Sequence, residues 1–229
     1  MQETGSNKET ISIQVSLSGY AFQISSSTLV HSSGWMSADR IFTTTELQRR
    51  YDIVNISVFT PKCALVPLDF FVKENARHIL EASTSLHESD LVDFEMVPEY
   101  NSVLVYSNTI GETLSKVISE MVLNPDGNKS KPLPELYWIL SDLKTLTEYN
   151  KIIASYKDGY LYLAIAQGKS LLLCNSFEAV DFTTALYHIF RAMKRLQLNP
   201  EVSSISFRTH LAEEQIMELY NYFKSVEII

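Results

Sequence analysis

The side chains in this sequence that could best hold a metal ion or act as acid and base form an acidic run. They are Glu88, Asp90, Asp93 and Glu95. Converging carboxylates can hold a divalent cation or work as a general acid and base. Asp93 and Glu95 share one face of an expected strand, but apolar residues alternate with them. That alternation is typical of a strand with one solvated and one buried face. We therefore expect a solvated strand face here and no metal site.

A second candidate is the tripeptide Gly168-Lys169-Ser170, which has the sequence that ends a phosphate-binding P-loop. That motif needs another glycine five residues before Gly168, where Leu163 stands, and it joins a strand to a helix. The tripeptide lies instead between two expected strands. Gly168 is therefore interpreted as a hairpin residue.

The histidines, cysteines and serines also give no motif for catalysis. The five histidines are scattered, and none has a second His, Cys or Asp at zinc spacing. Cys63 and Cys174 each lie in an apolar run, where a thiol usually behaves as a small buried side chain. The serine run at 25–27 has no G-x-S-x-G context. We expect no catalytic residue and no metal ligand in this chain.

The charge balance argues against nucleic acid as a partner. The chain has 19 Lys and Arg against 27 Asp and Glu, which gives a formal net charge of -8. Binding a phosphate backbone requires clustered cations. Only Arg191, Lys194 and Arg195 begin such a cluster, and they are typical of the solvated face of a helix. We expect a protein partner and no nucleic acid.

The hydrophobic content of 45% is enough for a buried core in a chain of 229 residues. The first ten residues are polar and have no apolar region of the signal-peptide type. No stretch reaches the ~20 continuous apolar residues that a membrane-spanning helix needs. We therefore expect a cytoplasmic protein without a membrane segment.

The last eighty residues predict a regular order of elements from their alternation and helical periodicity. That order is strands at 151–156, 160–166 and 169–175, a helix capped by Asp181, a strand at 202–207, a helix capped by Thr209 and a strand at 226–229. A less regular version of this order is expected from Ile11 to Tyr106. It includes an α-helix that begins at the capping box of Thr43 and Glu46 and ends near Tyr51.

The chain therefore looks like two α/β halves with mixed sheets that bracket a cleft. The segment from Asn124 to Pro134 holds three of the seven prolines and is the best candidate for a boundary. The expected parts are a polar tail at 1–10, a first subdomain at 11–123, a linker and connecting helix at 124–149, and a second subdomain at 150–229.

Three short segments resemble a known family. They are Ile11-Ser-Ile-Gln-Val-Ser-Leu-Ser-Gly19 followed by Phe22, Asn175-Ser176-Phe177 before a capped helix, and Leu219-Tyr-Asn-Tyr-Phe223. Together they resemble the bacterial family called domain of unknown function 3822, over nearly the whole chain. The resemblance implies the actin-like ATPase fold, of the ribonuclease H-like type, with two βββαβαβ subdomains around a cleft.

The resemblance also implies where a nucleotide would bind. In actin-like ATPases each subdomain contributes a hairpin whose strand carries an aspartate and whose glycine-rich turn presents backbone N–H groups to phosphate. The matching first turn at 16–19 has no acidic residue, and in the second turn the acid lies in the turn itself, where a type I′ hairpin explains it. The implied cofactor-binding residues are Ser16, Ser18, Gly19, Asp158 and Gly159.

Two functions follow as hypotheses. The first is a non-catalytic, actin-like-fold interaction or scaffold protein with a degenerate nucleotide cleft and no cofactor. The alternative is an ATP-binding protein, or an ATPase-like or kinase-like enzyme, that uses the cleft between the subdomains with ATP and magnesium. The missing strand aspartate favours the first hypothesis, because fold does not imply function.

Overall fold

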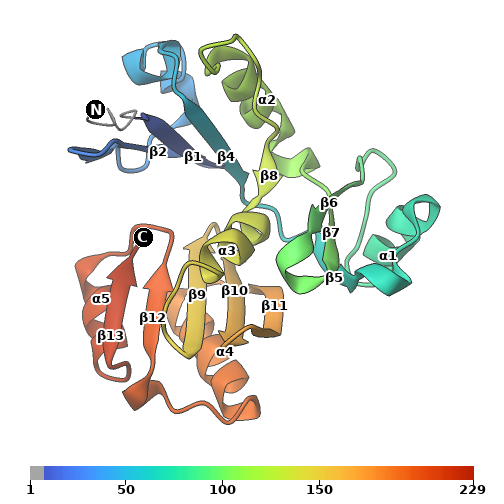
Figure 1. Ribbon diagram of the computed structural model, residues 1–229, viewed down its shortest axis with the longest axis vertical. Coiled ribbons are helices and arrows are strands. Elements are labelled where there is room, and N and C mark those ends of the chain that lie inside the picture. Colours follow the sequence, from blue (N-terminus) through green and yellow to red (C-terminus); the bar gives the residue numbers. More distant parts are fainter. Residues whose placement is uncertain (1–7) are drawn as a thin grey trace, which may run out of the picture. The chain divides into compact units, whose positions relative to one another are not determined.

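The computed structural model describes residues 8–229, and these divide into two compact units (Figure 1). One unit comprises residues 8–59 and Thr109–Leu133, and the other comprises Thr60–Asn108 and Pro134–Ile229. The chain therefore crosses from one unit to the other three times. Each unit is described by itself.

The subdomain boundaries expected from the sequence, 11–123, 124–149 and 150–229, stay a prediction. Compactness groups residues by their contacts, whereas those boundaries follow the repeated order of elements. Of the expected polar tail at 1–10, residues 1–7 lie outside the described residues.

The first sheet has five strands in the order β3-β2-β1-β4-β8. Their bounds are β1 (Thr10–Ser16), β2 (Gly19–Ser25), β3 (Val30–Ser32), β4 (Ile53–Val58) and β8 (Leu133–Pro134). β1 pairs antiparallel with β2 and parallel with β4, so the sheet is mixed. The first two strands confirm the hairpin predicted from the alternating sequence.

The register of this sheet follows from its buried face. Ile13 lies opposite Phe22 on β2 and opposite Ile56 on β4, and all three side chains are buried. A shift by one residue would turn every apolar side chain of β1 to the other face, so burial fixes the register. The core is completed by the helix α2 (Glu112–Met121), whose Ile118 is fully buried.

The α-helix predicted from Thr43 to Tyr51 is wrong. This stretch contains a 3-10 turn at Thr45–Gln48, after another at Ala38–Arg40. The N-cap residue Thr44 makes no side-chain cap and bonds instead to the Tyr20 hydroxyl at 2.7 Å. Phe42, which directly precedes the predicted capping box, is 68% exposed. The hydroxyl of Thr43, the predicted cap, donates instead to the Arg40 carbonyl at 3.0 Å, so the local signal does not produce an α-helix.

An insertion at 60–108 separates β4 from α2. It contains a three-stranded antiparallel sheet in the order β5-β7-β6 and one short helix. The bounds are β5 (Cys63–Pro67), α1 (Ala76–Glu81), β6 (Asp93–Val97) and β7 (Ser102–Tyr106). The repeat in the first half therefore does not end at Tyr106 as predicted. Its last helix and strand are α2 and β8, which follow the insertion.

The second sheet also has five strands, in the order β11-β10-β9-β12-β13. Its strands and the three helices around it have the bounds α3 (Glu135–Leu143), β9 (Asn150–Lys157), β10 (Tyr160–Gln167), β11 (Ser170–Glu178), α4 (Phe182–Arg195), β12 (Ser204–Phe207), α5 (Glu213–Tyr220) and β13 (Ser225–Ile228). β9 pairs antiparallel with β10 and parallel with β12. The predicted C-terminal order of elements is confirmed. The predicted cap of the last helix is wrong, because α5 begins after Ala212 and the Thr209 hydroxyl accepts from the Tyr156 N–H at 3.0 Å instead.

The helices cover both faces of this second sheet. Ala154 on β9 belongs to the core that includes residues of α4 and α5. The next residue, Ser155, points to the opposite face and bonds to Glu135 at the start of α3. α3 also contacts β9 and β10. The second half thus has three layers, and the long helix begins at Asp181, whose side chain accepts a hydrogen bond from the Thr184 N–H as predicted.

Both five-stranded sheets therefore share one topology. Numbered within each half, the strand order is 3-2-1-4-5, with the first strand antiparallel to the second and parallel to the fourth. This is the repeat that the sequence predicts. Among residues 8–229, no helix is long and apolar enough to span a bilayer.

Candidate functional site

The first predicted turn joins β1 to β2. The Ser18 N–H donates to Ser16 Oγ at 3.1 Å, and the two hydroxyl oxygens lie 2.9 Å apart. Ser16 is buried, and Leu17 at the tip of the turn is 71% exposed. The serine side chains thus hold the turn together. No residue of the turn supplies a carboxylate to a metal ion.

Gly19, the last residue of that turn, is required by a close backbone approach. Its φ is +139°, and an added Cβ would lie 2.0 Å from the carbonyl oxygen of Met36. Tyr20 and Met36 exchange backbone hydrogen bonds of 2.9 and 2.7 Å, which hold that carbonyl in place. The side of Gly19 from which its Cβ would project therefore faces the partial negative charge of an oxygen.

The second predicted turn joins β9 to β10. Asp158 and Gly159 have φ values of +48° and +78°, which a type I′ hairpin requires at its two central residues. The Gly159 carbonyl accepts from the Ala179 N–H at 2.8 Å, and Lys157 Nζ lies 3.7 Å from the Asp158 carboxylate. Burial lowers the pKa of Lys157, against the opposing effect of Asp158. The geometry of a type I′ hairpin is therefore enough to explain why Asp158 and Gly159 stand in this turn.

The two turns belong to different compact units. Their role in holding a nucleotide, through Ser16, Ser18, Gly19, Asp158 and Gly159, stays a prediction.

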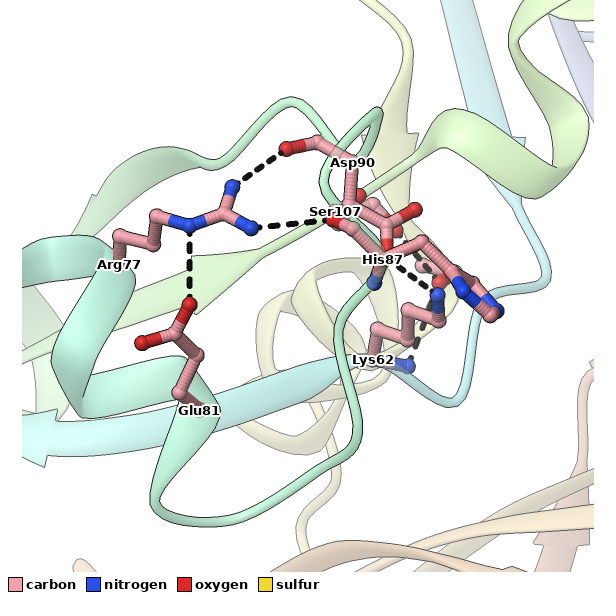
Figure 2. A network of polar contacts seen from close by, with 7 residues as sticks. Lys62, Arg77, Glu81, His87, Asp90 and Ser107 are labelled. Atoms are coloured by element: carbon pink, nitrogen blue, oxygen red, sulfur yellow. Dashed lines mark hydrogen bonds and ion pairs between the residues drawn. The ribbon is translucent and has the colours of Figure 1, made fainter.

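The insertion contains a buried ion pair that the sequence analysis does not predict. Lys62 Nζ lies 2.5 Å from Asp90 Oδ2, and their side chains are 11% and 3% exposed (Figure 2). The hydrogen bond from Lys62 lowers the pKa of Asp90, against the raising effect of burial. The His87 N–H also donates to this carboxylate, at 2.8 Å. Asp90 is thus a structural anchor and not a free acid.

Arg77 of α1 is hydrogen-bonded to the loop that carries Asp90. Its guanidinium donates to the carbonyls of Asp90 and His87 at 2.9 and 3.0 Å, and to Glu81 at 2.9 Å (Figure 2). At the root of the insertion, Thr60 donates to the Ser107 carbonyl at 2.6 Å. These bonds fix a loop that has little regular structure. They consume the polar groups that could otherwise bind a ligand.

A second buried network lies where α3 meets β9. Glu135 is fully buried and accepts from Ser155 Oγ at 2.6 Å and from Arg208 Nε at 2.9 Å. Arg208 also pairs with Asp142, on the same helix as Glu135. Burial raises the pKa of Asp142, although Arg208 works against that rise. Arg208 thus offsets the charges of two carboxylates, one at each end of α3.

The two cysteines are free thiols, as expected. Burial raises the pKa of Cys174 to about 12 and that of Cys63 well above its usual value. A nucleophilic cysteine needs the opposite shift. Both pKa shifts therefore favour the protonated thiol at neutral pH.

Metal-binding clusters are also lacking in the part of the chain that the structure describes. There, no group of three or more His, Cys, Asp or Glu side chains is placed to hold an ion. Of the acidic run, Asp90 is the buried ion-pair partner and Asp93 lies exposed on β6.

The second half has a groove between the edge strand β11 and the helix α4. Its volume is about 300 Å³. Leu173, Asn175 and Phe177 line it from β11, and His188, Arg191 and Arg195 line it from α4. The Phe177 and His188 rings stack with centroids 4.9 Å apart. The groove thus combines an apolar floor with two guanidinium groups.

The first half has a cavity beside its own edge strand. It has a volume of about 320 Å³ and is lined by Phe22, by His31 on β3 and by residues of the two 3-10 turns, including Arg40 and Thr44. Hydroxyl groups dominate this lining. Each cavity is lined by the third strand of its half and by the connection that follows it, but the two linings differ in chemistry.

Solved structures show which fold this chain has. A crystal structure from Bacteroides thetaiotaomicron VPI-5482, described as a protein with actin-like ATPase fold and unknown function, matches with a TM-score of 0.69 and 19% identity, over 100% of this chain and 94% of that chain. A chain of the PilM-PilN type IV pilus biogenesis complex matches with a TM-score of 0.50 and 12% identity, over 96% and 88% of the two chains. The protein has the actin-like ATPase fold, as the resemblance implied.

The sequence then identifies the family. The family described as Protein of unknown function (DUF3822) matches residues 4–226, so the chain belongs to it. No curated protein matches the sequence.

The sequence reasoning missed both buried ion-pair networks. Lys62 stands alone among the apolar residues that open β5, and a lone cation in such a run is a signal that it is paired. Glu135 and Arg208 are 73 residues apart, so no local pattern connects them.

Proposed function

We propose that this protein binds another protein through an actin-like scaffold and does not turn over nucleotide. The observation that carries the proposal is the chemistry of the first hairpin. Its turn has two serines bonded to each other and no carboxylate, and the Cβ position of its glycine faces the Met36 carbonyl oxygen. A phosphate group would meet repulsion from that oxygen, and magnesium would find no ligand in the turn.

The structural neighbours support a role in assembly. One of them comes from a complex that carries the names of two proteins, PilM and PilN. An actin-like fold is therefore compatible with a role in a protein assembly. By analogy, the partner of this chain is a protein. The cytoplasm stays the expected place of action.

The first test is thermal unfolding with 5 mM ATP and MgCl₂, compared with MgCl₂ alone. A ligand at ~100 times its Kd raises the free energy of unfolding by about 2.7 kcal/mol, a shift of several degrees. We expect no shift. A rise that Asp158→Ala abolishes, together with phosphate release from ATP, would establish the alternative of a nucleotide-dependent enzyme.

A gain-of-function variant tests whether the missing carboxylate is the reason that nucleotide does not bind. Ser18→Asp places a carboxylate in the first turn, which the proposal identifies as deficient. If the missing acid is the principal defect, Ser18→Asp gains magnesium-dependent ATP stabilisation that the wild type lacks. Ser26→Asp, in the turn after β2, is the matched control for added charge.

A further inference from the structure

The groove between β11 and α4 differs in charge from the chain as a whole. The helix α4 carries Arg191, Lys194 and Arg195 and no acidic residue, whereas the whole chain has a net charge of -8. Arg191 and Arg195 are four residues apart, so they lie on one helix face. Both line the groove.

These two arginines make no ion pair and no side-chain hydrogen bond with other residues in 8–229. Elsewhere in the same unit arginines are paired, as Arg77 is with Glu81 and Arg208 is with Glu135. Guanidinium groups favour bidentate pairing with carboxylates. The groove thus presents two cations whose complementary anions would come from another molecule.

The floor of the groove is apolar. Leu173 and Phe177 come from alternate positions of β11, and Leu196 follows the end of α4. The Phe177 ring is already ordered by its stack on His188. A pre-ordered aromatic surface lowers the entropy cost of holding an apolar side chain. This floor suits a large aliphatic or aromatic side chain between two carboxylates.

β11 itself favours an extended peptide over a small molecule. It is the edge strand of its sheet, and within residues 8–229 it pairs only with β10. The inserted segment contacts part of it through β5 and through the bond from Ser176 Oγ to the Pro61 carbonyl, at 2.9 Å. An edge strand offers its outer backbone groups to an added chain. A volume of about 300 Å³ is at the small end for a small-molecule site.

A second copy of this chain is a poorer occupant than a different protein. Antiparallel pairing of β11 with its own copy would generate a two-fold axis perpendicular to the sheet. The two α4 helices, with their arginines, would then adjoin on one face of the joined sheet. Like charges at such an interface are repulsive.

We propose that the β11–α4 groove binds an extended segment of a partner protein in which acidic residues flank a large apolar residue. The carboxylates pair with Arg191 and Arg195, and the apolar side chain packs on Phe177 and Leu173. The inference rests on the proposed function, which it deepens by naming the surface and the chemistry of the partner.

The experiment is selection of peptides from a random 12-residue display library on the full-length protein. The affinity of the enriched peptides is then measured by fluorescence anisotropy. We expect them to carry Asp or Glu beside an apolar residue, and to bind Arg191→Glu and Arg195→Glu at least tenfold more weakly. Lys194→Glu is the matched control. It makes the same change of charge on the same helix turn, but Lys194 does not line the groove, so affinity should change less than threefold.

Three other outcomes would overturn the inference, each in a recognisable way. Enriched peptides that bind the arginine variants and the wild type equally would exclude the groove but leave a protein-binding role intact. No enriched peptide, with a labelled oligothymidylate bound instead and released by Arg191→Glu, would assign the groove to nucleic acid. A dimer in sedimentation that Arg195→Glu dissociates would assign it to a second copy. Nucleotide turnover would contradict the proposed function but would not test the inference about the groove.

Discussion

Between β11 and β12 the second half of the chain has a helix of 14 residues, whereas the first half spans the corresponding distance between β3 and β4 with two 3-10 turns. The edge strands differ in the same way, with nine residues in β11 and three in β3. The strand order is nevertheless the same. The shared sheet therefore does not require the crossover helix, and the connections are where the two halves acquire different surfaces.

The two halves also differ at the connection after the fourth strand. In the first half the insertion at 60–108 stands between β4 and α2, whereas in the second half a short loop leads from β12 to α5. The insertion is bonded to the second-half unit through Ser176 and Pro61, and through Lys144 and Glu99 at 2.6 Å. A part that belongs to the first half by sequence order thus belongs to the other unit by packing.

The largest expected effect concerns the two hairpin turns. Gly19→Ala should lower the free energy of unfolding by about 4 kcal/mol, because a Cβ would collide with backbone and φ would be strained. Gly159→Ala, whose Cβ would meet nothing nearer than 3.9 Å, should lose about 1 kcal/mol. Urea denaturation measures both. Gly34→Ala, with nothing within 4 Å, is the control in the first half. Equal losses at Gly19 and Gly159 would refute the close approach to Met36.

The next effect concerns the crossovers. Phe182 begins α4, is 9% exposed, and lies 5.6 Å from the Tyr156 ring centroid. Phe182→Ala should lower the free energy of unfolding by about 3 kcal/mol through the cavity it leaves. Phe42→Ala, at an exposed position of the first crossover, should change it by less than about 0.5 kcal/mol. A large loss at Phe42 would mean that this crossover has a buried helix after all.

A smaller effect tests whether the insertion is held by its ion pair. Asp90→Asn should lower the free energy of unfolding by about 2 kcal/mol at pH 7, because it weakens a charged hydrogen bond inside the fold. The folded-state pKa of Asp90 lies below its usual 3.8, so the pair stabilises the protein above that pH. The stabilisation is lost as the pH falls through the folded-state value.

The measurement is urea denaturation of wild type and Asp90→Asn between pH 7 and pH 2. The difference between them should shrink below about pH 4. Glu88→Gln, at an exposed position of the same acidic run, should match the wild type throughout. A difference that is independent of pH would show that the Asp90 carboxylate does not exchange its proton in this range.

The smallest effect concerns the cap of α4. Asp181→Ala should lower the melting temperature by about 2–4 °C, because the Thr184 N–H loses its acceptor. Ser37→Ala, at the N-cap of the first 3-10 turn, where the side chain caps nothing, should lower it by less than about 1 °C. Scanning calorimetry separates these shifts. Equal shifts in melting temperature for Asp181→Ala and Ser37→Ala would show that the Asp181 cap does not stabilise its crossover more than Ser37 does.

The fold was predictable from the sequence where local patterns and packing agree. The alternation of Ile11, Ile13 and Val15 predicts β1, and the helical spacing after Asp181 predicts α4. The prediction failed between Thr43 and Tyr51, because the capping box is a local signal. The Thr43 hydroxyl bonds back to the Arg40 carbonyl, and the neighbouring Thr44 is held by Tyr20. Intrinsic preference is a weak prior that tertiary contacts override.

The site was less predictable than the fold. The type I′ turn at Asp158 and Gly159 follows from the residues alone, and the structure confirms it. The ion pair of Glu135 and Arg208 depends on two segments that only the folded sheet brings together. The groove at β11 combines residues of a strand and a helix, and its existence depends on how they pack. Arg191, Lys194 and Arg195 were visible in the sequence as a basic cluster, but their neighbour across the groove was not.

The insertion also affects the order in which the protein can assemble during its synthesis. Pro61 leaves the ribosome 115 residues before Ser176, to which it bonds in the folded protein. At a rate of about 5–20 residues per second, the insertion waits roughly 6–23 s for this partner. Over that interval the three-stranded sheet β5-β7-β6 must persist on its own small core of Leu80, Val103 and Val105. A synonymous change that slows translation between 110 and 170 would lengthen that wait and expose the apolar edge of β5 to aggregation.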